Sequence, residues 1–337
     1  MTEHPTAGRL TGRAASALCV LVAGVVLALA ASCSEAPQLP LRVGLNPWVG
    51  YDPLVLARER GLFSPSDVHV VELETSSESA RQLRNGLIEA AGLTLPEAVE
   101  LAAMGTDLRV IAVLSLSRGA DAVLARPSIG SASELRGTRV GLEDTALASI
   151  MLQRLLEAGG LRRDEVSLLT LPVVDHESAL KAGRVDAVIT FEPVISRLSA
   201  AGFAVLLDSA NMPGEVVDVL VVRADALQLR PHQVKVLLDA FEAGRREMLA
   251  HPAEAANALA AGADLDVDEY ALAMSRLNLF SAAQSQALLA APADSPVLGL
   301  AQLASDLKAS GRMMAEPDWA RLFVPDAAAG SGGKGAR

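Results

Sequence analysis

Cysteine is nearly absent from the sequence: 337 residues contain two, Cys19 and Cys33. Both lie close to the N-terminus, so the folded part has neither a disulfide framework nor a thiolate metal site. The five histidines are scattered, and the sequence has no paired-His metal motif, no Gly-x-Ser-x-Gly elbow and no dinucleotide fingerprint. We therefore expect no metal, no cofactor and no enzymatic activity.

Basic residues are also scarce. The sequence has 29 Lys and Arg residues against 40 Asp and Glu residues, and its formal net charge is −11. No basic stripe and no basic amphipathic helix appears along the chain. This balance disfavours nucleic-acid binding and adsorption to anionic lipid.

A long apolar run occurs only at the N-terminus. Arg9 and Arg13 precede an apolar stretch at 14–30, and Ala30-Ala31-Ser32-Cys33 resembles a bacterial lipoprotein box with Ala in place of the usual Leu. The pattern predicts a signal peptide over 1–33 that exports the chain, with Cys33 as the lipidation site. The protein would then be a periplasmic or cell-surface lipoprotein. The alternative is a tilted transmembrane anchor, which needs roughly 20 apolar residues.

Strand-like and helix-like patterns alternate from Leu41 to about Arg223, which is typical of an α/β protein with mostly parallel sheets. Beyond Arg230 the pattern predicts helices only, and the Gly-rich residues 326–337 are predicted to be a disordered tail. Strands are expected at 41–45, 68–73, 109–114, 139–142, 166–169, 185–190, 203–207 and 216–222.

The chain repeats itself at an offset of 97 residues, from Arg42 to Arg139. The same offset relates Glu89 to Asp186, and several Gly and Pro positions stay in one register. Because Gly and Pro mark turns, this favours two copies of one unit. The alternative is that α/β units share this punctuation without a common design.

Few aromatic residues are available, only 3% of the chain, yet Trp48 and Tyr51 share the loop after the first expected strand. Ligands of open parallel sheets bind beyond the carboxyl ends of the strands. We therefore predict that Trp48 and Tyr51 contact a ligand, together with Phe191 after a later strand. The alternative is that Trp48 and Phe191 close the core beneath these loops.

Polar residues follow the other expected strands of the first copy. Ser76 and Ser77 belong to Thr75-Ser76-Ser77-Glu78, which has capping-box spacing, so they either cap a helix or bind a polar ligand. Thr94 follows the third strand, and Ser117 lies where the chain is expected to cross between lobes. All four are predicted ligand-binding residues.

The second copy supplies mostly acidic candidates: Glu143, Thr145, Glu192 and Asp218. Glu192 and Asp218 are the best candidates for hydrogen-bonding an amine, amide or hydroxyl; the alternatives are helix capping for Glu192 and an exposed strand face for Asp218. Arg118 is the only obvious cation in these loops, so a neutral or cationic heterocycle fits the pattern better than nitrate or a sulfonate.

These segments resemble the nitrate/sulfonate/taurine and thiamine-pyrimidine class of ABC substrate-binding proteins. The similar segments are WVGYDPL at 48–54, ARERGLF at 57–63, SELRGTRVG at 133–141 and GRVDA at 183–187. The resemblance covers about 41–223, and in such proteins the ten predicted site residues occupy loops that face the ligand cleft. It implies a two-lobed type II periplasmic-binding-protein fold. Lobe I would be 41–120 plus 216–325 and lobe II 121–215, with crossings near 117–123 and 213–219.

The resemblance further implies a monomeric binding protein that closes around a small solute and delivers it to an ABC permease and ATPase. Two alternatives stay open at this stage. The first is a lipoprotein that presents its closed form to a membrane signalling partner. The second is an enzyme on the same fold, with Asp175-His176-Glu177 as an acid/base cluster, although we expect Asp175 to cap a helix instead.

Overall fold

The computed structural model describes residue 1, residues 39–212 and residues 216–327. The predicted signal peptide with Cys33, and residues 328–337 of the predicted tail, lie outside these ranges. The chain divides into the units Met1–Leu39 and Pro40–Arg337, and all described helices and strands belong to the second. No described helix combines the length and the apolar character needed to cross a membrane.

Lobe I is built on a six-stranded sheet with the order β11-β4-β10-β3-β1-β2. Strands β2, β1 and β3 run parallel, whereas β10 runs antiparallel to both β3 and β4, and β11 antiparallel to β4. The strands are β1 (Leu41–Leu45), β2 (Val68–Glu72), β3 (Ala90–Thr94), β4 (Leu108–Ser117), β10 (Val217–Arg223) and β11 (Leu277–Leu279).

Lobe II is built on a five-stranded sheet with the order β7-β6-β8-β5-β9. Its strands are β5 (Asp121–Ala125), β6 (Arg139–Leu142), β7 (Ser167–Thr170), β8 (Ala187–Phe191) and β9 (Ala204–Asp208). Both sheets are mixed rather than mostly parallel, because β5 and β10 run antiparallel to both of their neighbours. Each of these two strands enters its sheet directly from the other lobe, without the helical crossover that keeps strands parallel.

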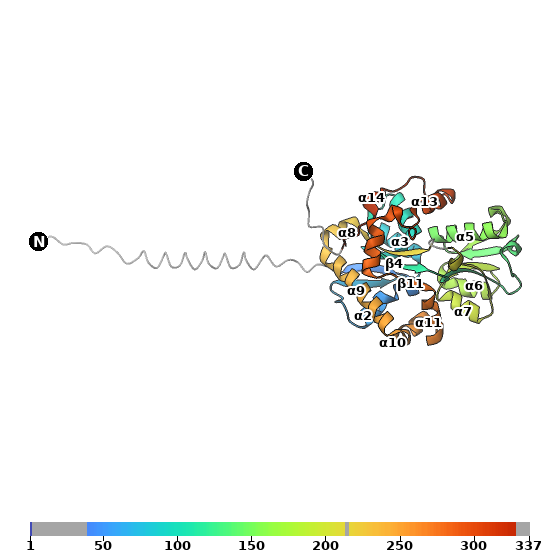
Figure 1. Ribbon diagram of the computed structural model, residues 1–337, viewed down its shortest axis with the longest axis horizontal. Helices are drawn as coiled ribbons and strands as arrows, with labels where there is room; N and C mark the ends of the chain where they lie inside the picture. Colours follow the sequence, from blue (N-terminus) through green and yellow to red (C-terminus); the bar gives the residue numbers. More distant parts are fainter. Residues whose placement is uncertain (2–38, 213–215, 328–337) are drawn as a thin grey trace. The chain divides into compact units, whose positions relative to one another are not determined.

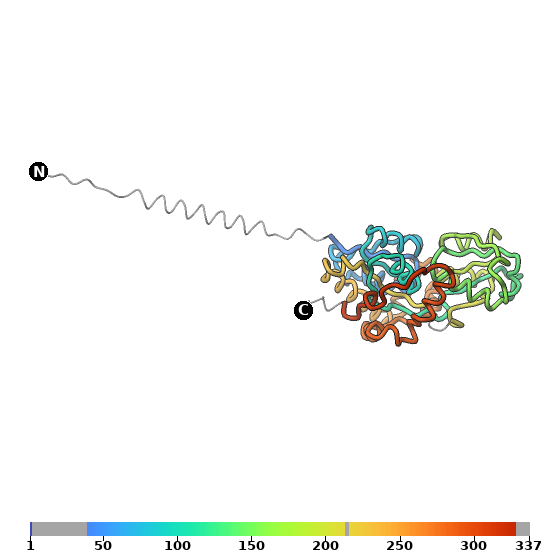
Figure 2. Tube along the Cα trace, turned by 90° about the horizontal axis from the view of Figure 1, so that it is seen from above, coloured from blue at the N-terminus to red at the C-terminus, as the bar shows by residue number. Residues whose placement is uncertain are grey.

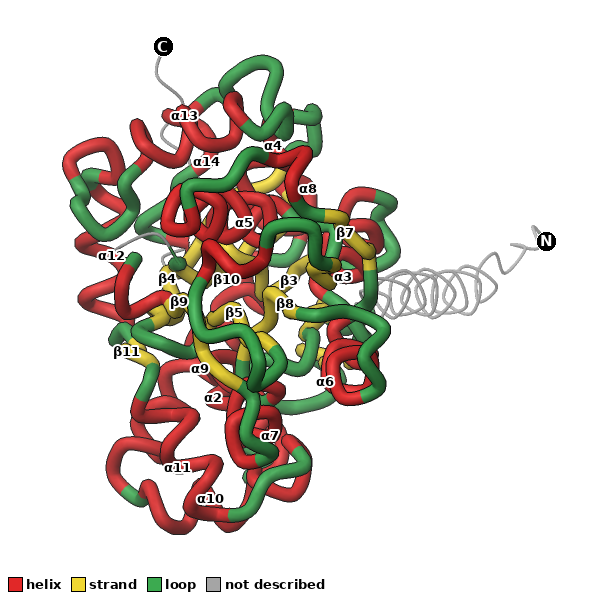
Figure 3. The backbone as a smooth tube through the Cα atoms, turned by 90° about the vertical axis from the view of Figure 1, so that its right-hand side faces the viewer, coloured by secondary structure: helices red, strands yellow, loops and turns green. Residues whose placement is uncertain are grey.

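Helices cover both faces of each sheet, and the strands lie inside the helical layer (Figures 1 and 3). In lobe II, α5 lies on one face and α6 and α7 on the other (Figure 1). The helices of the first 212 residues are α2 (Asp52–Glu59), α3 (Ser76–Arg84), α4 (Leu95–Ala103), α5 (Ala146–Gly159), α6 (His176–Lys181) and α7 (Val194–Ala200), with the 3₁₀ turns η1 (Val49–Tyr51) and η5 (Ser209–Asn211).

The C-terminal segment returns to lobe I, where its orange and red elements lie against the blue N-terminal ones (Figure 2). It is helical as predicted, except that β11 adds a short strand to the sheet. Asp326, in the predicted tail, accepts a hydrogen bond from Gln286. The segment contains α8 (Ala224–Leu229), α9 (Pro231–Ala250), α10 (Pro252–Leu259), α11 (Val267–Ser275), α12 (Ala282–Ala290), α13 (Leu300–Ala309) and α14 (Trp319–Leu322).

The 97-residue repeat is visible in matching ion pairs. Arg42 at the second position of β1 pairs with Glu89, just before β3, at 2.5 Å. Its counterpart Arg139 at the start of β6 pairs with Asp186, just before β8, at 3.1 Å. Each carboxylate also accepts a hydrogen bond from the backbone N–H of its arginine. Equivalent ion pairs therefore join equivalent strands in the two lobes.

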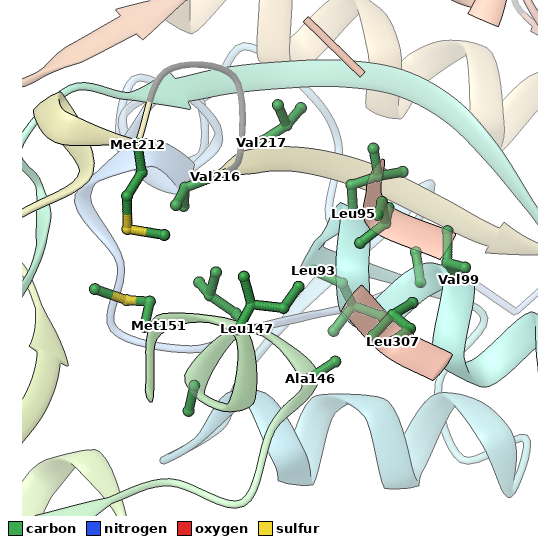
Figure 4. Packing of buried hydrophobic residues seen from close by; sticks show 14 of the residues in the cluster. Leu93, Leu95, Val99, Ala146, Leu147, Met151, Met212, Val216, Val217 and Leu307 are labelled. Carbon is green, nitrogen blue, oxygen red and sulfur yellow. The ribbon is translucent and has the colours of Figure 1, made fainter. Parts of the chain in front are cut away.

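An apolar cluster continues from lobe I into lobe II. In it, Leu147 and Met151 on α5 face Met212 and Val216, which flank the second crossing between the lobes (Figure 4). Leu95 and Val99 of α4 belong to the same cluster. The lobes thus share buried apolar surface near the crossings in addition to their polar contacts.

Replacing Gly244 by Ala is expected to destabilise lobe I by about 3 kcal/mol. A Cβ at this position on α9 would lie 1.8 Å from the backbone oxygen of Pro53 at the start of α2, and a backbone atom cannot rotate away. Urea unfolding of the full chain measures the change. Gly262→Ala is the matched control, because its Cβ meets nothing within 4 Å. Equal unfolding free energies for the two variants would contradict this close packing of α9 on α2.

Candidate functional site

A cavity of about 40 Å³ lies between the lobes. Residues at or just after the carboxyl ends of β1 and β3 in lobe I and of β6 and β8 in lobe II line it. Ligands of such sheets bind at the carboxyl ends of the parallel strands. Seven of the ten predicted site residues line it: Trp48, Tyr51, Ser76, Thr94, Glu143, Thr145 and Asp218. The other lining residues are Asn46, Glu97, Asp121, Leu147, Ala148, Met151, His176, Ile189, Thr190 and Phe191.

Three aromatic side chains form one wall of the cavity. Trp48 of lobe I meets Phe191 of lobe II edge-on, with ring centroids 5.7 Å apart and an interplanar angle of 89°. Tyr51 lies over Gly92 in β3, where a Cβ would come within 2.7 Å of its ring. Gly50 makes room for the Trp48 indole in the same way. The wall therefore depends on two glycines that leave space for the rings.

Glu97 of α4 accepts hydrogen bonds from two hydroxyl-bearing residues of lobe I. Its Oε2 accepts hydrogen bonds from Ser76 Oγ at 2.8 Å and from the Thr94 backbone N–H at 2.9 Å. Burial raises the pKa of Glu97 to about 7, although these hydrogen bonds act in the opposite direction. The Ser76 hydroxyl is thus already committed to a carboxyl group within the site.

Asp121 is the first residue of β5 and Asp218 the second of β10, the two strands that follow the crossings between the lobes. The 97-residue repeat relates the two residues to each other. Asp218 accepts a hydrogen bond from Ser115 Oγ at 2.5 Å. Burial raises the pKa of Asp121 to about 7. Burial, followed by the neighbouring charge of Asp121, raises the pKa of Asp218 well above its ordinary value. Two neighbouring carboxyls therefore share one buried site, where the charge of Asp121 disfavours ionisation of Asp218.

Glu143 connects the lobes. Its Oε1 accepts hydrogen bonds from the Ser77 backbone N–H at 2.8 Å and from Ser77 Oγ at 2.5 Å. Its Oε2 is buried without a hydrogen-bond partner. Thr145, two residues on, caps α5 through its side chain. One oxygen of Glu143 thus joins α3 of lobe I, while the other is available to a ligand.

Other polar contacts join the lobes at the edges of this site. Arg276 of lobe I pairs with Glu192 of lobe II at 2.5 Å. Arg154 of lobe II pairs with Asp306 of lobe I at 2.7 Å. The lobes are therefore held together around the cavity on more than one side.

Three predicted site residues lie outside the cavity lining. Ser77 acts as the donor to Glu143. Ser117 shares a hydrogen bond with Ser209 Oγ at 2.6 Å, beside the first crossing. Glu192 caps α7 by accepting the Ser196 backbone N–H at 3.0 Å, which is the alternative considered for it from the sequence.

His176, which the sequence suggests only as part of a possible acid/base cluster with Asp175 and Glu177, lines the cavity. Its Nε2 lies 3.2 Å from the carbonyl oxygen of Leu171, so Nε2–H donates and Nδ1 is left as an acceptor. Burial lowers the pKa of His176 to about 4, which keeps the ring neutral. The expected cap was wrong: Asp175 makes no side-chain capping hydrogen bond to α6.

Among the residues that the structure describes, no Lys or Arg lines the cavity. Arg118, the one cation expected in these loops, is exposed. Within the residues that the structure describes, no group of three or more His, Cys, Asp or Glu side chains is arranged to hold a metal ion. The site thus brings together four carboxyls, a neutral imidazole and an aromatic wall.

Several known proteins are similar to this chain. The putative thiamine biosynthesis protein of Haemophilus influenzae is 25% identical over 69% of this chain and 76% of its own. The bicarbonate transport ATP-binding protein CmpC of Synechocystis is 29% identical over 60% of this chain, which spans only 35% of CmpC.

Solved structures agree on the fold. The alkanesulfonate-binding protein SsuA of Xanthomonas axonopodis pv. citri, bound to MOPS, superimposes with a TM-score of 0.68 at 19% identity. The match covers 87% of this chain and 99% of SsuA. This likeness confirms the two-lobed periplasmic-binding-protein fold.

The model of the NMT1-like family matches residues 34–262, which is well over half of the chain. The match includes both sheets except β11, and every residue that lines the cavity. The periplasmic nitrate-binding protein NrtA of Synechocystis shares the fold as well, with a TM-score of 0.71 at 15% identity over 87% of this chain and 88% of NrtA. The chain therefore belongs to the NMT1-like family.

Proposed function

We propose that this protein is a monomeric lipoprotein, anchored through Cys33 outside the cytoplasm, that binds a small polar, amine-bearing solute. It hands the solute to an ABC permease and its ATPase. The observation that carries the choice of solute is the acidic lining of the cavity: it contains Glu97, Asp121, Glu143 and Asp218 but no Lys or Arg from the described part of the chain. Buried carboxyls attract a cation or an N–H donor and repel an anion.

The acidic lining disfavours the anions that give the similar proteins SsuA and NrtA their names. A sulfonate or nitrate site would need Arg or Lys beside helix N-termini. Here the helix start at Ser76 faces Glu97, and the start of α5 lies beside Glu143. The fold is shared with SsuA, whereas the charge of the site favours a ligand of the opposite sign.

Closure of the lobes explains delivery without any bond being broken. A ligand that touches residues of both lobes stabilises only the closed state, and a permease can distinguish that state from the open one. Glu143 is suited to this coupling because one oxygen binds Ser77 across the cleft and the other faces the cavity. Division into lobe I (41–120 and 216–325) and lobe II (121–215) follows from the same proposal.

The proposal is tested first by thermal shift of the full chain with small amines, neutral amides and anions of matched size. An amine at about 100 times its Kd should add roughly 2.7 kcal/mol of stability. Stabilisation only by nitrate or alkanesulfonates would overturn the amine assignment. No shift with any class would overturn the solute-binding role.

Uptake by cells tests delivery and anchoring. Cells lacking the protein should accumulate less of the labelled hit, and the wild-type chain should restore uptake. Cys33→Ala should restore less, because the lipid keeps the protein at the membrane beside its permease. Full uptake in cells lacking the protein would contradict the transport role, and full rescue by Cys33→Ala would contradict the anchor.

A further inference from the structure

Among the residues that the structure describes, six buried polar atoms of the cavity lining have no hydrogen-bond partner: Asn46 Oδ1, Trp48 Nε1, Asp121 Oδ2, Glu143 Oε2, His176 Nδ1 and Thr190 Oγ1. Their residues are at most 7% exposed. Each unsatisfied buried polar group costs about 1–3 kcal/mol. Since these atoms converge on one cavity, a bound molecule that satisfies them is the simplest account of their arrangement.

The chemistry of these atoms selects the partner. The amide oxygen of Asn46 accepts hydrogen bonds, and so do the carboxylate oxygens of Asp121 and Glu143 when these residues are ionised. Nδ1 of His176 is also an acceptor, because Nε2–H is used on Leu171. Thr190 Oγ1 can accept or donate. Trp48 Nε1–H is the one fixed donor among these atoms, and it acts on the neighbouring Asp218 carboxyl, whose pKa burial raises and this N–H lowers. The other atoms include at least four acceptors, so the cavity needs a ligand rich in N–H donors.

The acceptors approach from several directions. Asn46 follows β1, Asp121 begins β5, Glu143 follows β6, and His176 begins α6. A primary ammonium concentrates three donors on one nitrogen, and a quaternary ammonium has none. A guanidinium or amidinium spreads its N–H groups around a plane, so it can reach acceptors on several sides.

Size and shape agree with a planar head. At roughly 10–15 Å³ for each water-sized group, the cavity of about 40 Å³ takes about three or four non-hydrogen atoms. Guanidinium and acetamidinium each have four. Trp48, Tyr51 and Phe191 supply aromatic surface on which a planar cation can stack.

We propose that the solute carries a guanidinium or amidinium head, which donates to the unpartnered acceptors of Asn46, Asp121, Glu143 and His176 and lies against the aromatic wall. This inference rests on the proposed solute-binding function and makes its ligand class specific. Because the head bonds to residues of both lobes, it also holds the cavity closed.

Calorimetry on the full chain in detergent tests the head group. The probes are the chlorides of guanidinium, acetamidinium, methylammonium and tetramethylammonium, at low millimolar concentrations that do not denature. Guanidinium and acetamidinium should bind at least tenfold tighter than methylammonium, and tetramethylammonium should not bind. Agmatine distinguishes a free head from one on an aliphatic chain: tighter binding by agmatine indicates a longer solute with the same head.

Variants separate specific recognition from general attraction to negative charge. Asn46→Leu removes one acceptor without changing charge and should weaken guanidinium about tenfold. Asp239→Asn removes an exposed charge on α9, outside the cavity lining, and should leave guanidinium binding unchanged. Equal loss in both variants would overturn the proposed contacts.

Failure of this inference differs from failure of the proposed function. If methylammonium or tetramethylammonium binds as tightly as guanidinium, the head-group assignment is wrong and amine binding stands. If the cations do not bind while another small amine stabilises the chain in the thermal-shift series, the head group is again wrong and the solute-binding function stands. If nothing binds in either experiment, both are overturned.

Discussion

Asp121→Asn is expected to weaken binding of the cationic solute about 100-fold while raising the melting temperature of the unliganded protein. Removing one partner of a buried charge pair costs about 2–5 kcal/mol of binding, and 1.4 kcal/mol corresponds to a factor of ten. Asn keeps the shape of Asp but supplies no negative charge. Calorimetry with guanidinium on the full chain measures the loss.

The gain in stability has a separate physical cause. Asp121 is buried, and Glu97 and Glu192 both raise its pKa through their charges. At pH 8 the ionised carboxyl therefore costs folding free energy, on the order of 1–3 kcal/mol, and Asn removes much of that cost. We expect the unliganded melting temperature to rise by several degrees.

Opposite changes in affinity and stability are the diagnostic result. A variant that merely disturbs folding would lose both together. Asp239→Asn, exposed on α9 and paired with Lys235, provides the matched control and should leave both unchanged. Unchanged affinity in Asp121→Asn would show that this carboxyl does not contact the solute.

Much of the architecture could be predicted, because it follows from local patterns. The alternation of apolar segments with helices located most strands, and the 97-residue repeat anticipated the matching pairs Arg42–Glu89 and Arg139–Asp186. The mixed sheets could not be anticipated in the same way. The direction of β5 and β10 depends on where the chain crosses between lobes, which no local periodicity records.

The site was predicted in part for a similar reason. Loops after parallel strands carry an obvious signal, so Trp48, Tyr51 and Glu143 were found. Glu97 and His176 lie on helices, where a capping-box or helix-start pattern hides their second role. Asp121 carries a signal in the sequence as well, since the 97-residue offset relates it to Asp218.

Lowering the pH from 8 to 5 is expected to weaken binding of the cationic solute. The affinity should fall about 100-fold for each carboxyl that must release a proton when the solute binds. Burial raises the pKa of Asp121 and of Glu97 to about 7 in the empty cavity. Below pH 7 the solute must displace these protons, and each one costs about tenfold per pH unit. Guanidinium keeps its charge throughout this range, so the change belongs to the protein.

The other titratable groups at the cavity do not reverse this sign. Burial, followed by the charge of Asp121, raises the pKa of Asp218 well above its ordinary value, and burial also raises the pKa of Glu143. The pKa of Tyr51 is raised well above 10. His176 stays neutral above its pKa of about 4. Outside the lining, Glu192 also has a pKa raised by burial.

Stability of the unliganded chain should follow pH in the opposite direction. A carboxyl whose pKa is raised on folding contributes stability that is fully present below its unfolded pKa of about 4 and is lost as pH rises to about 7. The unliganded contribution therefore falls between pH 4 and 7, while solute affinity rises. Calorimetry in two buffers of different ionisation enthalpy would detect proton release on binding near pH 6. Binding that releases no protons and is independent of pH between 8 and 5 would mean that the solute does not meet these carboxyls, and that the acidic cavity is not where it binds.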